Sequence, residues 1–136
     1  MKKQYYVLFR ILTSTIFLYA GIGHLLNANK IFAKLSATQF YNMMPEKTLI
    51  TFFIYLSGFV MVAAGIMLAT GFKERKAATA LLIVLIPITL SVQLDNLKDL
   101  GPFFKNVAIA GSLLLIINYK QNENKNTGRI HSYASN

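Results

Sequence analysis

The chain has 136 residues, enough for one compact unit, and it is 54% hydrophobic but only 14% charged. This composition is too apolar for an ordinary soluble domain. The absence of cysteine excludes disulfides, CxxC redox chemistry, thiolate metal sites and a cysteine nucleophile. The net charge of +9 does not indicate nucleic-acid binding, because the basic residues flank long apolar runs. We therefore expect the chain to lie in a lipid bilayer.

Four apolar stretches are long enough to cross a membrane as helices. We expect these helices over about residues 5–26, 49–70, 77–94 and 102–119. Gly71 is placed to end the second helix, and Gly101-Pro102 is a start signal for the fourth. The predicted fold is all-α, an integral membrane four-helix bundle that forms a single domain over residues 1–121.

Three segments need separate interpretation. Met1 to Leu26 also fits a cleaved signal peptide, but the run is long for one and no clean cleavage site closes it, so we expect a retained helix. Residues 27–47 alternate apolar and polar side chains, which predicts either a short interfacial segment or a surface loop over the bundle mouth. Residues 122–136 are rich in Asn, Lys and Ser, and we expect a disordered polar tail.

The distribution of basic residues predicts the orientation, because Lys and Arg near membrane spans stay in the cytoplasm. Nine of the 14 Lys and Arg residues lie at the two ends and in the middle loop. The other five lie in the remaining two loops. We therefore expect a multi-pass protein of a bacterial-type cytoplasmic (inner) membrane with both termini in the cytoplasm.

With this topology, polar residues from three helix ends meet at one outer rim. The candidate ligand-binding residues there are His24, Gln93, Asp95, Lys105 and Asn106, and Arg10 lies on the same face of the first helix as His24. A structural alternative stays open for each residue: His24 as a hydrogen-bonded interface residue, Asp95 as a solvated charge, Lys105 as a snorkelling side chain. No metal site and no catalytic nucleophile is apparent.

Small residues permit close helix crossings in a membrane. Gly21, Gly58, Gly65 and Gly111 are the glycines to which we assign helix packing rather than chemistry.

Three motifs together resemble the DoxX family. They are Gly21-Ile22-Gly23-His24, the series Gly58, Gly65 and Gly71, and the run from Pro102 to Ala108. The resemblance covers roughly residues 7–118 and implies a four-helix membrane protein of a group that includes members associated with quinone-linked or membrane oxidoreductase systems. It places the family's G-x-x-H-like signature on Gly21 and His24, and its Lys-Asn pair on Lys105 and Asn106. Where relatives often carry a glutamate, this chain has Met61, which puts a proton-coupled role in doubt.

Two functional hypotheses follow. In the first, the protein is a membrane subunit or accessory of an oxidoreductase system and binds a quinone-like molecule at the outer rim, with a soluble or membrane redox partner. In the second, it is a non-catalytic membrane assembly or interaction protein. A transporter ranks third, because four helices need an oligomer to form a pathway; whether the chain forms a homo-oligomer is open.

Overall fold

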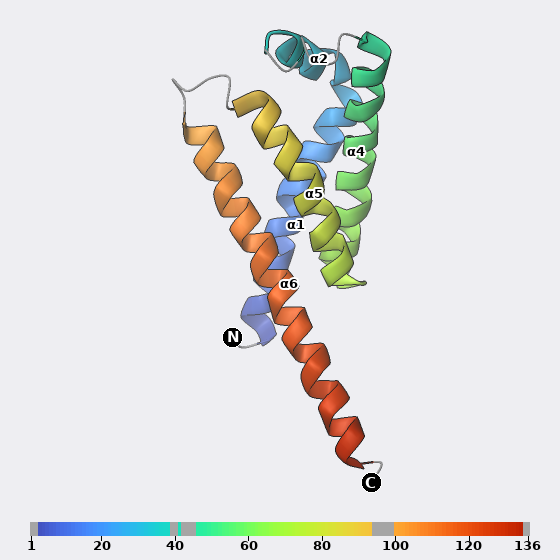
Figure 1. The fold of residues 1–136 in the computed structure, drawn as a ribbon, viewed down its shortest axis with the longest axis vertical. Coiled ribbons are helices and arrows are strands. Elements are labelled where there is room, and N and C mark those ends of the chain that lie inside the picture. Colours follow the sequence, from blue (N-terminus) through green and yellow to red (C-terminus); the bar gives the residue numbers. More distant parts are fainter. Residues whose placement is uncertain (1–2, 39–40, 42–45, 94–99, 135–136) are drawn as a thin grey trace.

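The computed structural model describes the backbone of residues 3–38, 41, 46–93 and 100–134, and their side chains except at 91–93 and 122–134. All regular structure in this described part is helical (Figure 1). The helices are α1 (Lys3–Leu26), α2 (Ala28–Ser36), α4 (Lys47–Thr70), α5 (Glu74–Gln93) and α6 (Gly101–Ala134). The expected all-α fold is therefore confirmed.

Three of the described helical segments have the length and hydropathy needed to cross a membrane. They are α1, α4 and the first part of α6, Gly101–Gln121. The third expected span, residues 77–94, corresponds to α5, which continues through Pro87 and is not one of these three. The three spans define a multi-pass membrane protein.

Gly71 ends α4 where the sequence predicts, because it adopts the left-handed conformation with φ of 85°. Its N–H donates to the carbonyl of Leu68, and the N–H of Phe72 donates to the carbonyl of Met67, which is the Schellman pattern. Lys73 is also left-handed, with φ of 47°. This tight turn places Glu74 at the first residue of α5, directly beside the end of α4.

The segment between the first two spans contains a helix, α2, as the interfacial alternative expects. Ala28 of α2 is buried with Ile50 and Ile54 of α4, and Ile31, Phe32 and Leu35 pack against them. The Nζ of Lys47 lies 5.4 Å from the centre of the Phe32 ring. The apolar face of α2 therefore covers the beginning of α4 (Figure 1).

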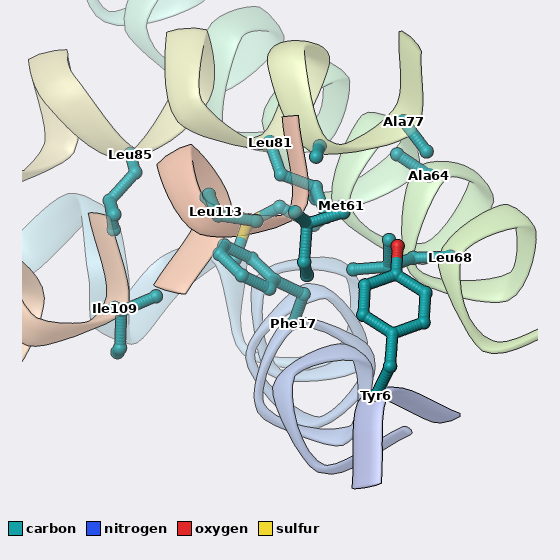
Figure 2. Packing of buried hydrophobic residues seen from close by; sticks show 12 residues of the cluster. Tyr6, Phe17, Met61, Ala64, Leu68, Ala77, Leu81, Leu85, Ile109 and Leu113 are labelled. Carbon is teal, nitrogen blue, oxygen red and sulfur yellow. The ribbon is translucent and has the colours of Figure 1, made fainter. Parts of the chain in front are cut away.

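One apolar core joins the four long helices. Phe17 of α1, Leu68 of α4, Leu81 of α5 and Leu113 of α6 are all at most 2% exposed. Figure 2 shows these helices converging on Phe17 and Met61. Met61 is an apolar core residue with 4% exposure.

Three of the four packing glycines lie where helices approach closely. A Cβ on Gly21 would lie 2.9 Å from the carbonyl oxygen of Gly58, and a Cβ on Gly58 would lie 2.9 Å from the Cβ of His24. A Cβ on Gly65 would lie 3.0 Å from Leu18. These contacts explain how α1 and α4 pack along their length. A Cβ on Gly111 would meet no described atom within 4 Å, and its assignment to helix packing stays a prediction.

Beyond residue 121, where the sequence predicts a disordered polar tail, α6 continues as a helix to Ala134. Residues 121–127 contain Gln, Glu and Lys, which favour helix, and no proline interrupts the segment. Figure 1 shows this part of α6 extending well past the ends of the other helices.

Candidate functional site

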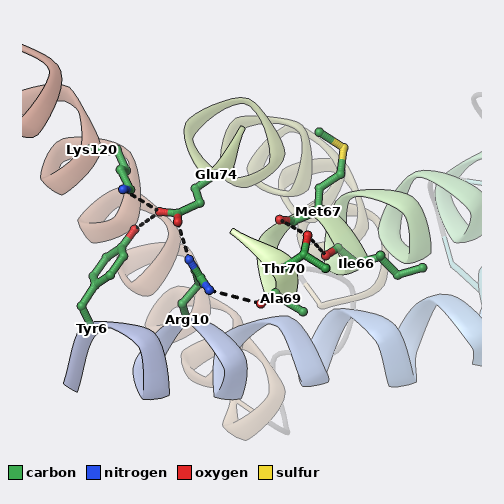
Figure 3. A network of polar contacts seen from close by, with 8 residues as sticks. All are labelled: Tyr6, Arg10, Ile66, Met67, Ala69, Thr70, Glu74 and Lys120. Atoms are coloured by element: carbon green, nitrogen blue, oxygen red, sulfur yellow. Dashed lines mark hydrogen bonds and ion pairs between the residues drawn. The ribbon is translucent and has the colours of Figure 1, made fainter. Parts of the chain in front are cut away.

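The most developed polar site in the described structure lies at the end of the molecule that holds the start of α1. We name it the Glu74 cluster; it consists of Tyr6, Arg10, Glu74 and Lys120 (Figure 3). The Glu74 carboxylate accepts a hydrogen bond from the Tyr6 hydroxyl at 2.5 Å and forms an ion pair with Arg10. The Lys120 Nζ lies 3.6 Å from the same carboxylate. One acid from α5 therefore binds groups from α1 and α6.

The cluster also contacts α4 and is shielded from solvent. Arg10 donates from Nη2 to the carbonyl of Ala69 at 3.2 Å, so that α4 joins the network. The rings of Tyr6 and Tyr119 stack with centroids 4.3 Å apart. The side chains of Arg10 and Glu74 are only 11% and 5% exposed. A buried carboxylate needs such partners, because an unpaired charge in apolar surroundings is costly.

Two details show how closely the cluster is packed. A Cβ on Gly71 would lie 2.5 Å from the Nη1 of Arg10, so the glycine gives the guanidinium its space. The Nε of Arg10 is buried and has no hydrogen-bond acceptor among the described residues. The arrangement fixes the guanidinium by its two terminal nitrogens alone.

His24 lies at the opposite end of α1 and is hydrogen-bonded to α4. Its Nδ1 is 2.9 Å from the Oγ of Ser57, which itself donates to the carbonyl of Ile54 at 2.8 Å. The Ser57 hydroxyl therefore joins the imidazole of α1 to the backbone of α4.

Asn106 ties a second pair of helices at this end. It is 8% exposed, and its Nδ2 donates to the Oγ1 of Thr89 on α5 at 3.0 Å. The neighbouring Lys105 is exposed. Among the described residues, no hydrogen bond or ion pair links His24 with Lys105 or Asn106. Asp95 and the side chain of Gln93 lie outside the described residues.

The structure therefore separates the predicted site residues into three groups. His24 fastens α1 to α4, Asn106 fastens α5 to α6, and Arg10 belongs to the Glu74 cluster at the other end. The sequence analysis missed Tyr6, Glu74 and Lys120. One signal was present: an arginine inside a membrane span needs an acidic partner, and the expected topology leaves only Glu74 and Glu123 on its side.

Each of these groups joins one helix to another. The described residues hold no cluster of three His, Cys, Asp or Glu side chains that could bind a metal ion. In the Glu74 cluster, two cations, Arg10 and Lys120, share the single carboxylate of Glu74.

The fold and these fastenings define a multi-pass helical membrane protein. A family model described as DoxX matches residues 6–94, more than half of the chain. The protein therefore belongs to the DoxX family, which confirms the resemblance. The match covers α1 to α5; the motif from Pro102 to Ala108 lies beyond it. No curated protein matches the chain, and no solved structure does.

Proposed function

We propose that the protein is a non-catalytic membrane assembly or interaction protein, in which the described polar side chains hold the helices in one arrangement. The Glu74 cluster carries this proposal, because a single buried carboxylate connects α1 and α6 with the start of α5, and Arg10 connects them with α4. The pairs His24–Ser57 and Asn106–Thr89 have the same role at the other end.

The topology that goes with this function is a bundle of four transmembrane helices, with α5 as the fourth span. The shared apolar core of α1, α4, α5 and α6 supports it. In this arrangement both termini and the Glu74 cluster lie on the cytoplasmic side of a bacterial-type inner membrane, in agreement with the larger number of basic residues there. The single domain comprises residues 1–121, and α6 carries the tail.

Partners of such a protein are the lipid bilayer and a second polypeptide. Aromatic side chains of α4 are available for contact, since Phe52 and Phe59 are 60% and 66% exposed. Aromatic residues are enriched at protein interfaces. Their exposure to lipid or to a partner helix carries little free-energy cost. A redox protein or a second copy of the chain would both satisfy this role.

A second candidate function is the binding of a quinone-like molecule beside His24, as a subunit or accessory of an oxidoreductase system. The imidazole of His24 supports it, because a ring held in place through Ser57 is oriented to hydrogen-bond a ligand. Gly23 supports it also, since nothing described lies within 4 Å of its Cβ position. In this candidate Gln93, Asp95, Lys105 and Asn106 complete the ligand rim.

Native mass spectrometry of the protein extracted with its surrounding lipid separates these functions. The assembly role predicts a complex with a second polypeptide in fixed stoichiometry, retained in the His24→Ala variant, and no quinone. A quinone that co-purifies with the wild type and is lost in His24→Ala would contradict the assembly role and establish the ligand site. The matched control is Ser36→Ala, because Ser36 is exposed on α2 and bonds only its own helix.

A further inference from the structure

Two surface depressions meet on the side of α5 next to the Glu74 cluster. The first has a volume of about 370 Å³ and is lined by Gly71, Lys73, Glu74, Arg75, Lys76 and Lys120. The second has a volume of about 380 Å³ and is lined by Arg75, Lys76, Thr79, Ala80 and Ile83. Arg75 and Lys76 line both depressions, and we name the surface that the two cover together the α5 groove.

The first half of the α5 groove is strongly positive. Four cationic side chains and a single carboxylate line it, and that carboxylate already binds Arg10 and Tyr6. Arg75 and Lys76 are exposed and form no ion pair with a described residue. The groove therefore fits a group that carries negative charge on several oxygens, such as a phosphate diester.

The second half of the groove is apolar. Arg75, Thr79 and Ile83 recur every four residues and so lie on one face of α5. Ile83 is 64% exposed, and Arg75 lies eight residues before it, about 12 Å along the helix axis. The surface thus changes from cationic to hydrocarbon over the distance that separates a lipid headgroup from its acyl chains. A soluble anion would leave the apolar half uncovered, and an uncharged quinone would leave the cations unpaired.

We propose that the α5 groove binds an anionic diacyl phospholipid, with its phosphate between Lys73, Arg75 and Lys76 and one acyl chain along Ala80 and Ile83. The proposal rests on the membrane placement of the chain and is independent of the assembly role. The predicted orientation fits it, because the cytoplasmic leaflet is the one rich in anionic lipid. The bound lipid would link the turn after α4 to α5 and α6.

The test measures binding of fluorescent dioleoyl phosphatidylglycerol to the purified full chain in a neutral detergent, in competition with unlabelled lipids. We expect unlabelled phosphatidylglycerol to compete and dioleoyl phosphatidylcholine to compete poorly. The variant Arg75→Gln/Lys76→Gln should bind phosphatidylglycerol roughly tenfold more weakly, because each basic residue near the surface strengthens binding to anionic lipid. The charge-matched control Lys30→Gln/Lys34→Gln, on α2, should change the affinity less than twofold.

Three results would overturn the proposal. Equal losses in the two glutamine variants would show general attraction to a basic protein. Competition by glycerol 1-phosphate as strong as that of the lipid would show a soluble phosphate ligand instead. Loss of binding in Arg75→Lys/Lys76→Arg, which keeps both charges and guards against a folding defect, would show that charge at these positions is not the cause.

Discussion

Glu74 shows how much can depend on one side chain. It is 6% exposed, and its carboxylate accepts a hydrogen bond from Tyr6 and forms ion pairs with Arg10 and Lys120. The variant Glu74→Gln keeps the shape but removes the charge, which leaves the buried guanidinium of Arg10 without its counter-ion. We expect thermal unfolding in detergent to show a loss of about 3 kcal/mol, the order found when one partner of a buried pair is removed.

The double variant Arg10→Met/Glu74→Gln is the control for this prediction. It removes both charges, so it should be more stable than Glu74→Gln alone, and the coupling between the two positions should be at least about 1 kcal/mol in a double-mutant cycle. Additive losses in the cycle would contradict the ion pair as the cause.

Gly71 is sensitive for a different reason, which is its backbone. Gly71→Ala places a Cβ in the left-handed conformation, at φ of 85°, and 2.5 Å from the Nη1 of Arg10. We expect a loss of about 2 kcal/mol in the same unfolding measurement. Gly23→Ala is the matched control: it lies within a helix, its Cβ position is open, and alanine there should be neutral or stabilising by up to about 1 kcal/mol. Equal effects of the two variants would refute this explanation.

At the scale of the helix, the crossing of α1 and α4 depends on glycines. Gly58→Ala would put a Cβ 2.9 Å from the Cβ of His24 and 3.1 Å from Leu25, so the helices must separate. We expect a loss of about 1 to 3 kcal/mol, the usual range for overpacking. Gly111→Ala, on the open face of α6, should leave the melting temperature unchanged or higher. An unchanged melting temperature of Gly58→Ala would contradict this prediction, because it would show that the crossing of α1 and α4 accommodates a larger side chain.

The helices could be predicted from the sequence more completely than the polar site. Apolar runs and stop signals are local, so the C-terminal end of α4 and the start of α6 follow from Gly71 and Gly101 alone. The Glu74 cluster depends on pairs 64 and 68 residues apart in the chain. In the sequence Glu74 stands between Lys73 and Arg75 and is typical of a solvated loop, because nothing local shows that a tight turn buries it.

His24 and Asn106 show the same limit. The predicted topology places both near one end of the molecule, but it does not specify the partner of each side chain. Ser57 and Thr89 are those partners, and both lie inside apolar stretches. A hydroxyl in such a stretch does not indicate a partner on another helix. Such hydroxyls commonly bond their own helix, so the sequence does not single them out.

For the whole molecule, the absence of cysteine allows a direct measurement of orientation. Single variants Lys30→Cys on α2 and Lys76→Cys on α5 place a thiol at exposed positions on opposite sides of the proposed bilayer. With both termini in the cytoplasm, a membrane-impermeant maleimide should label Lys30→Cys in intact cells. It should label Lys76→Cys only after the membrane is opened. The reverse pattern would invert the orientation.

The length of α6 has a mechanical consequence. Its 34 residues extend for about 50 Å, whereas the hydrocarbon core of a bilayer is about 30 Å thick. Its far end therefore stands some 20 Å outside the core, on a rod that is continuous with the buried Leu113 and Ile116. A tilt of α6 by about 10° at Ile116 would move Ala134, which lies about 27 Å further along the helix axis, sideways by about 5 Å.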